Sequence, residues 1–508
     1  MVAQNIQRLP YLSTLHQKRA SITLAARMNH CTQSNGSRYV PYRCQYRYVP
    51  VVCAAVPVVL LLVTNELLID SLSLSSFMRV APLLMSGSTV IVGLNGALQK
   101  RFVLASTRGE DNSDNSNSNN NKLIPGNVHR AKSVSTGVGG KGQDVAVTLE
   151  CLQFQGDLQL AQFVGQGAEG NLVYEMLTEL LGTQAMTLTV RTAAAMRTCT
   201  SIVAQDSTTE LVEPSGVIAQ AEMEQFMNNL DGIEACSAMV FMGSMPPGCS
   251  EETYATIYNR VAVGKNTLCL IDSVAGLDPL LQAIATKTDH GPAILKLNAS
   301  ELCRLAAVTK TSSETAGVRI EELVEAIPKF LAQHDPHAAK ALTAIAVTDG
   351  AHPAYLAVLP VAGEDEFRLF QLPVAKLTVD PQQNEADLPP FLLSSLHDLT
   401  LYPIGAGDAV AGGTMAAWKA LLEGPDAVTP CVHADIVAAL QGNDGPTVRV
   451  MLTAFSFGLA CGSASCLQEQ NSVLKIQDAL ALYHQTPRPT FLSSHKVRLV
   501  QSSKKVAS

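Results

Sequence analysis

The stretch that decides the fold is "LYPIGAGDAVAGGTMAAW", residues 401–418, in which glycines and alanines surround a single acid, Asp408. Gly405, Ala406 and Gly407 precede that acid, and residues this small let the backbone approach a ligand closely. From Asp408 onward the pattern predicts a helix whose first N–H groups and positive dipole end would form an anion site. An acid at a helix start is also a common cap, so the stretch alone leaves the role of Asp408 open.

A second glycine-rich stretch, "TGVGGKGQDVAVTLECL" (136–152), repeats this design upstream. Gly139 and Gly140 precede Lys141, and an amphipathic helix is expected to follow. A lysine on such a loop can reach an anionic ligand. The spacing is not that of a P-loop, because GxxxxGK[ST] is absent. A glycine turn with a solvated lysine is the alternative.

A third stretch, "ILKLNASEL" (294–302), places Asn298 and Glu301 three residues apart at a strand-to-helix junction. Side chains with this spacing lie on one face of a helix. Two oxygen donors arranged in this way suit Mg²⁺, in part through its water ligands. A capping box, in which Asn298 and Glu301 satisfy each other's backbone, is the alternative.

Short apolar runs rich in β-branched residues and bounded by turn formers predict strands along the chain. They are 88–95, 158–165, 200–204, 238–243, 267–272, 293–298, 344–349 and 354–359. Helical patterns lie between them, and later helices are expected over 407–422, 449–466 and 474–484. This alternation predicts an α/β domain with a mainly parallel central sheet, in which ligands bind beyond the carboxyl ends of the strands.

Taken together and in this order, the motifs "GVGGKGQDVA", "LKLNASEL" and "PIGAGDAVAGG" resemble the ribokinase-like sugar kinases of the PfkB family. The resemblance covers about Ser88 to Tyr483. "VGLNGAL", "TTELVEPSG" and "GSMPPG" look most like the phosphosugar branch, which includes 1-phosphofructokinase and tagatose-6-phosphate kinase. The implied fold has three layers around a mainly parallel sheet, plus a small β lid. Segments 187–191 and 200–204 are candidates for that lid, which can pair two subunits into a homodimer.

The resemblance implies that ATP, with Mg²⁺, donates its γ-phosphoryl group to a hydroxyl of a phosphorylated ketose. Fructose 1-phosphate, fructose 6-phosphate and tagatose 6-phosphate represent that class. Asp408 matches the family's catalytic base, and the N–H groups of Gly405, Ala406, Gly407 and Asp408 match its anion hole. The other implied contacts are Asn298 and Glu301 for the metal; Thr348, Gly350, Gly462 and Ser463 for ATP; and Gln99, Gly139, Gly140, Lys141, Asp144, Arg197 and Ser244 for the sugar phosphate.

Two positions depart from the phosphosugar branch. Gln99 stands where the branch has the Asp of "NPxxD", and Asp144 stands where it has the Asn that ends "GGKGxN". We hypothesise that Asp144 takes over hydroxyl binding while Gln99 becomes the amide partner. A kinase of an unphosphorylated sugar or nucleoside is an alternative, as is a non-catalytic protein that binds sugar or nucleotide on the same fold. Arg197 and "GSMPPG" favour the phosphosugar.

Charge and composition restrict the class of protein further. The net charge of -8 over 508 residues argues against a nucleic-acid-binding protein. Before Glu66 the chain has basic residues but no acidic ones, which is typical of a plastid or mitochondrial targeting segment. A cytoplasmic or a membrane-anchored location is the alternative, the latter because of the apolar segment 50–64. The kinase domain itself is not expected to bind a membrane.

We therefore expect an N-terminal extension over 1–87, a kinase domain over 88–487 and a C-terminal tail over 488–508. Within the domain, the polar low-complexity segment 105–126 is predicted to be an inserted loop. Two further stretches rich in Pro, Asp and Gln or Asn, 380–397 and 424–447, are predicted to be surface insertions.

Overall fold

The computed structural model describes residues 87–104, 123–124, 126–204, 207–262, 266–287, 290–309, 317–360, 365–377, 401–425, 428–440 and 444–496. All of them belong to one compact unit of the chain. The predicted extension before Gly87, nearly all of the 105–126 insertion and the whole of 380–397 lie outside the described residues.

The central sheet has ten strands in the order β14-β13-β12-β11-β10-β9-β8-β1-β4-β5. Every pairing from β11 to β5 is parallel, whereas β12, β13 and β14 add to one edge in antiparallel fashion. The strands are β1 (Ser88–Val92), β4 (Leu158–Gln166), β5 (Thr189–Ala195), β8 (Cys236–Met242), β9 (Leu268–Asp272), β10 (Ala293–Asn298), β11 (Ala344–Asp349), β12 (His352–Val358), β13 (Glu366–Leu372) and β14 (Thr490–Lys496). The predicted mainly parallel α/β sheet is confirmed.

Helices cover both faces of this sheet and give the predicted three layers. They are α3 (Lys141–Cys151), α4 (Gly167–Leu181), α5 (Gln220–Leu230), α6 (Thr253–Val261), α7 (Leu277–Ala285), α8 (Ala299–Leu305), α9 (Ile320–Gln333), α10 (Pro336–Ala339), α12 (Ala406–Glu423), α13 (Pro430–Ala438), α14 (Pro446–Ser465), α15 (Ile476–Gln485) and a 3₁₀ turn, η1 (Gln184–Met186). Val90 and Val92 join one core with α5 to α10, while Ile91 joins the other with α3, α12 and α14. The two-residue period of a strand produces this division.

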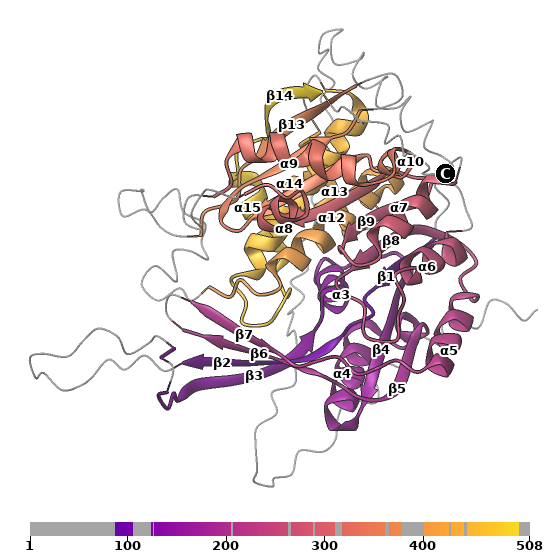
Figure 1. Cartoon of the computed structure of the whole chain (residues 1–508). Helices are drawn as coiled ribbons and strands as arrows, with labels where there is room; N and C mark the ends of the chain where they lie inside the picture. Colours follow the sequence, from indigo (N-terminus) through magenta and orange to yellow (C-terminus); the bar gives the residue numbers. More distant parts are fainter. Residues whose placement is uncertain are drawn as a thin grey trace, which may run out of the picture. The chain divides into compact units, whose positions relative to one another are not determined.

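A second sheet of four strands, in the order β3-β2-β6-β7, forms the lid. It consists of β2 (Ala97–Leu104), β3 (Ala131–Gly139), β6 (Thr198–Val203) and β7 (Thr208–Val212), which lie together beside the large sheet (Figure 1). Segment 200–204 therefore falls in the lid as predicted. The lid prediction for 187–191 is wrong, because Val190 pairs with Phe163 of β4 and is fully buried in the main core.

Two domain predictions need correction. Segment 424–447 is not a simple surface insertion, because it contains α13, whose Val432 and Ile436 are fully buried. The domain does not end at 487 either, because β14 pairs with β13 along the sheet edge. An edge strand of this kind, "TFLSSHK", is mostly exposed and has too few apolar residues to stand out in the sequence.

The small residues of 401–418 have a packing role in α12. A methyl group added at Gly412 would lie 2.7 Å from Thr148 Cγ2 of α3, and one added at Gly413 would lie 2.6 Å from Cys461 Sγ of α14. Helix α14 is long and apolar enough to cross a membrane, but 83% of that window is buried inside the protein. The close packing of α12 between α3 and α14 fixes the position of its N-terminus.

Candidate active site

Polar side chains meet at the carboxyl ends of four neighbouring parallel strands. Asp272 ends β9 and is paired in register with Met242 at the end of β8. Asn298 ends β10 and is paired with Thr348 of β11. Because these strands are parallel and adjacent, residues predicted to bind metal and nucleotide come together at one edge of the sheet.

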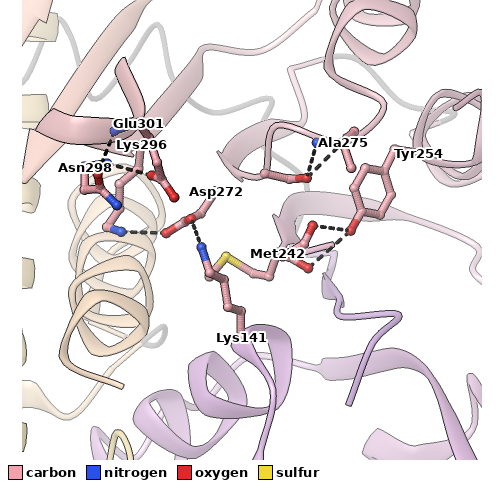
Figure 2. A network of polar contacts seen from close by, with 10 residues as sticks. Lys141, Met242, Tyr254, Asp272, Ala275, Lys296, Asn298 and Glu301 are labelled. Atoms are coloured by element: carbon pink, nitrogen blue, oxygen red, sulfur yellow. Dashed lines mark hydrogen bonds and ion pairs between the residues drawn. The ribbon is translucent and has the colours of Figure 1, made fainter. Parts of the chain in front are cut away.

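A buried carboxylate, Asp272, holds two lysines at this edge. Lys141 Nζ donates a hydrogen bond to its Oδ1 at 2.7 Å, and Lys296 Nζ donates one to its Oδ2 at 2.5 Å. Figure 2 shows the two lysines reaching Asp272 from different elements, with Asn298 and Glu301 beside Lys296. Burial raises the pKa of Asp272, but the charges of Lys296 and Lys141 outweigh it and hold that pKa below its ordinary value.

Lys141 is the more accessible of the two lysines. Its side chain is 42% exposed, against 6% for Lys296. Burial lowers the pKa of Lys141, but the nearby charges of Asp272 and Asp408 overcome this effect, and the net shift is upward. Lys141 is therefore a fixed cation that faces the open side of the site, as its predicted anion-binding role requires.

Asp408 is the third residue of α12 and does not cap it. The N-cap is Gly405, with φ at +87°, and no side chain makes the cap hydrogen bond. The capping alternative for Asp408 is therefore wrong. Burial and the charge of Asp272 raise the pKa of Asp408 to about 7, with Lys141 and Lys296 opposing the shift. A carboxylate with this pKa can accept a proton near neutral pH.

Two of the four N–H groups predicted for an anion hole already have acceptors. The Ala406 N–H donates to Pro403 O, and the Asp408 N–H to Gly405 O, each at 3.1 Å. Within the described parts of the chain, the N–H groups of Gly405 and Gly407 have no acceptor. A methyl group at Gly407 would lie 3.7 Å from Lys296 Nζ, so a buried cation lies against the same turn.

Asn298 and Glu301 form a capping box at the start of α8. Asn298 Oδ1 accepts from the Glu301 N–H at 2.8 Å, and Glu301 Oε2 accepts from the Asn298 N–H at 2.9 Å. No cluster of three or more His, Cys, Asp or Glu side chains suited to a metal occurs among the described residues. The second carboxylate oxygen of Glu301 is left for a cation. This donor set fits Mg²⁺ held mainly through water and phosphate oxygens.

The residues predicted to bind ATP fall into two groups. Thr348 lies beside Asn298, and Gly350 makes the β11–β12 turn at φ +62° with open space beside it. Gly462 and Ser463 instead lie in α14. A methyl group at Gly462 would meet Ala406 O at 2.9 Å, so this glycine allows α14 to pack against the start of α12.

The predicted phosphate contacts Arg197 and Ser244 converge on Asn95, at the turn after β1. Arg197 donates to the backbone oxygens of Asn95 at 2.7 Å and Gly96 at 3.2 Å. Asn95 Nδ2 donates to Ser244 Oγ at 2.9 Å, and its Oδ1 accepts from Ser215 Oγ at 2.8 Å. Arg197, Asn95 and Ser215 line a single pocket.

Two glycines of "GVGGKG", Gly139 and Gly140, lie in close contact with neighbouring side chains. Gly140 caps α3 at φ +111°, where a methyl group would meet Gln143 Oε1 at 2.4 Å. Gly139 lies against Gln99, since a methyl group there would be 3.1 Å from the Gln99 Cβ. The loop therefore places Lys141, the first residue of α3, next to the lid strand β2.

The two departures from the family pattern have different surroundings. Gln99 Nε2 donates to Ser201 Oγ at 2.5 Å within the lid. Asp144 is buried in α3, and burial together with the charge of Asp408 raises its pKa above the ordinary value. Hydrogen bonding from Asn471 and the charge of Arg101 oppose that shift. Asp144 therefore belongs to the same electrostatic group as Asp408, whereas the side chain of Gln99 is held by the lid.

Sequence reasoning missed several residues of this site, chiefly Asp272, Lys296, Asn95, Arg101 and Asn471. Asp272 had a signal, because it is the last residue of the predicted strand 267–272, and Lys296 lies within the quoted "ILKLNASEL". Arg101 and Asn471 had none, since they are far apart in sequence and meet only in the folded protein.

The fold and these motifs define an α/β protein of the ribokinase-like class. The model of the pfkB family carbohydrate kinases matches residues 111–377, just over half of the 508 residues. The chain therefore belongs to the pfkB family of carbohydrate kinases. The matched range ends before Asp408.

A curated relative, the 1-phosphofructokinase of Xanthomonas campestris pv. campestris, is 32% identical over 184 residues. These residues are 36% of this chain and 55% of the relative, so the chain spans about half the length of the curated relative it matches.

Two solved structures are similar to this chain. Phosphofructokinase-2 from Escherichia coli, in complex with potassium, has a TM-score of 0.50 at 16% identity, covering 78% of this chain and 98% of that one. A possible 1-phosphofructokinase from Thermotoga maritima has a TM-score of 0.48 at 15% identity, covering 80% and 100%. The Escherichia coli structure, at this identity, shows a shared fold and nothing about substrate.

Proposed function

We propose that this protein transfers the γ-phosphoryl group of ATP to a hydroxyl of a phosphorylated ketose of the fructose 1-phosphate, fructose 6-phosphate or tagatose 6-phosphate class. The observation that carries the proposal is Asp408, whose pKa is raised to about 7 at the N-terminus of α12. Its carboxylate caps nothing, and the lysines of the Asp272 cluster oppose that shift.

In this proposal Asp408 accepts the proton of the sugar hydroxyl as its oxygen attacks phosphorus. The unengaged N–H groups of Gly405 and Gly407 bind the phosphoryl oxygens at the dipole end of α12. Lys141 supplies a fixed positive charge on the open side of the site. Asp272 holds Lys141 in place, so it is a positioning residue.

Mg²⁺, when bound, would neutralise phosphate charge, as in phosphoryl transfer generally. Glu301 would hold it through its second carboxylate oxygen, mostly by way of water, and Thr348 would lie beside the nucleotide. The Asn298–Glu301 capping box keeps that carboxylate at the strand ends.

A phosphorylated rather than a free sugar is supported by Arg197, Ser244 and Asn95. A planar guanidinium pairs well with phosphate oxygens, and that of Arg197 is held by the Asn95 carbonyl in a pocket that Asn95 and Ser215 also line. Ser244 joins this group through its hydrogen bond with Asn95. The curated relative that matches part of the chain is a 1-phosphofructokinase.

A substrate panel tests the proposal. The full-length chain would be assayed for sugar-dependent ADP release with ATP and Mg²⁺ against fructose 1-phosphate, fructose 6-phosphate, tagatose 6-phosphate, fructose, ribose and adenosine. We expect at least one phosphosugar to exceed every unphosphorylated acceptor in kcat/KM by about a hundredfold or more. Turnover of free sugars or nucleosides alone would replace the phosphosugar assignment. Turnover of none would favour a non-catalytic binding protein.

We further propose that the lid pairs two copies of the chain. Val134 of β3 and Leu211 of β7 lie on the same face of the lid and are 52% and 57% exposed. Exposed apolar side chains on a sheet face are typical of an association surface. Replacing both with Thr should convert a dimer to a monomer in light scattering; a wild-type chain that is monomeric at high concentration would contradict this.

A further inference from the structure

Arg101 is a buried cation on the inner face of the lid. It lies on β2 and is only 3% exposed. Its Nη2 donates a hydrogen bond to Asn471 Oδ1, and its guanidinium lies 5.3 Å from the centre of the Tyr402 ring. Asn471 and Tyr402 both belong to loops of the large domain. Arg101 therefore fastens the lid to the body of the protein beside the candidate active site.

Asn471 lies at a corner of the chain between α14 and α15. The next residue, Ser472, has φ at +56°, and its Oγ donates to Gly405 O at 2.8 Å. Its own carbonyl accepts from Thr148 Oγ1 of α3 at 3.0 Å. A methyl group at Gly405 would lie 3.1 Å from the Asn471 Cβ. The corner is thus locked to the turn that carries Asp408 and to the helix that carries Asp144.

The side-chain amide of Asn471 lies between two groups of opposite charge. Its oxygen accepts from Arg101, and its side chain also hydrogen bonds to Asp144, which lowers the pKa of that acid against the effect of burial. An amide suits this position because one end accepts and the other donates. A carboxylate in the same place could not donate to Asp144.

Two buried atoms of this group are unsatisfied. Among the described residues, Asp144 Oδ1 and Arg101 Nε have no hydrogen-bond partner, although both residues are at least nine-tenths buried. Unpaired polar atoms in such places are rare and indicate a ligand, a water molecule or an ion. One is an acceptor and the other a donor, which matches a hydroxyl group.

We propose that Asn471 is a positioning residue that sets sugar specificity by holding Asp144 and Arg101 as an acceptor–donor pair for a substrate hydroxyl. This inference rests on the proposed kinase function. Because Asn471 acts through groups on the sugar side, its loss should weaken sugar binding and leave nucleotide binding nearly unchanged. The corner also aligns that pair with Asp408 through Ser472 and Gly405.

The test is equilibrium binding and steady-state kinetics of the full-length chain and its Asn471→Ala and Asn471→Asp variants. The probes are fructose 1-phosphate, fructose 6-phosphate and ATP with Mg²⁺. We expect the Kd and KM for the bound phosphosugar to rise about tenfold or more, because the amide that hydrogen bonds to two buried charged groups, Arg101 and Asp144, is removed. Those for ATP should change by less than about twofold. Asn228→Ala, on the exposed surface of α5, is the matched control and should change neither.

A double-mutant cycle with Arg101→Met separates positioning from simple packing. If Asn471 acts through Arg101, the double variant should lose little more sugar affinity than either single variant. Additive losses, or equal losses for sugar and ATP, would overturn the proposal. Asn471→Asp is nearly isosteric, so it provides the same comparison if the alanine variant does not fold. A wild-type chain that binds a phosphosugar without phosphorylating it would overturn the kinase function, while the binding comparison would still test Asn471.

Discussion

Replacing Asp408 with Asn should make the protein more stable at alkaline pH, even as it abolishes the proposed base. The pKa of Asp408 rises from an ordinary value of 3.8 to about 7 on folding, chiefly because of burial and the charge of Asp272. A group whose pKa is higher in the folded protein opposes folding once it is ionised. Below pH 3.8 it is protonated in both states and the penalty is absent. Above pH 7 the penalty is complete.

The size of the effect follows from the shift in pKa. The shift is about 3 units, and each unit corresponds to about 1.36 kcal/mol, so the upper limit is about 4 kcal/mol. Asp408 is partly open to solvent, and screening by solvent weakens the effect, so we expect about half, or about 2 kcal/mol, at pH 8. The gain should shrink towards zero as the pH falls from 7 to 4.

The assay is thermal unfolding of wild type and Asp408→Asn at pH 5, 6, 7 and 8. For measurements of turnover with the same variant, the matched control is Asp478→Asn. Asp478 is also the third residue of a helix, α15, and lies outside the site. A stability difference that is constant across this range, or a variant less stable at pH 8, would refute the account of the Asp408 environment. The pH dependence of wild-type kcat/KM should show a rise with a midpoint near pH 7 for the same reason.

Two further predictions concern the groups around Asp408. Lys296→Met should destabilise the protein by about 3 kcal/mol or more in thermal unfolding, because it leaves the buried Asp272 with Lys141 as its partner, which is more exposed. The control is Lys329→Met, which removes a surface ion pair with Glu325 and should change stability by less than about 0.5 kcal/mol. Gly405→Ala should combine strain at φ +87° with a contact 2.8 Å from a serine oxygen, and should cut both turnover and stability. Gly424→Ala, at φ +98° with open space around it, should show only the strain, about 1 kcal/mol. Equal losses of stability for Lys296→Met and Lys329→Met, or for Gly405→Ala and Gly424→Ala, would contradict the environments assigned to Lys296 and Gly405.

The fold could be predicted from the sequence wherever local pattern and burial agree. Strands buried on both faces, such as 293–298 and 344–349, have the continuous apolar runs typical of a parallel sheet, and the structure places β10 and β11 at these ranges. The lid strands β2 and β3 were missed because polar residues occupy much of their length. Segment 187–191 was misassigned because its pattern cannot distinguish a lid strand from an edge of the main sheet.

The candidate site was predictable where glycine marks it. Gly405 and Gly140 take positive φ at the starts of α12 and α3, and such glycines draw attention to Asp408 and Lys141. The buried charge cluster was not predictable, because the lysines that compensate Asp272 come from separate elements and no sequence spacing relates them. The contact between Arg101 and Asn471 joins residues 370 positions apart and depends entirely on tertiary structure.

The most direct test of the central claim is phosphosugar-dependent ADP release at pH 8 by wild type, Asp408→Asn and Asp478→Asn, with ATP and Mg²⁺ saturating. We predict that Asp408→Asn lowers kcat by about a hundredfold or more while phosphosugar binding changes little, since general base catalysis contributes at least that much. Asp478→Asn should match wild type. An Asp408→Asn variant that turns over at near the wild-type rate would contradict the assignment of Asp408 as the base.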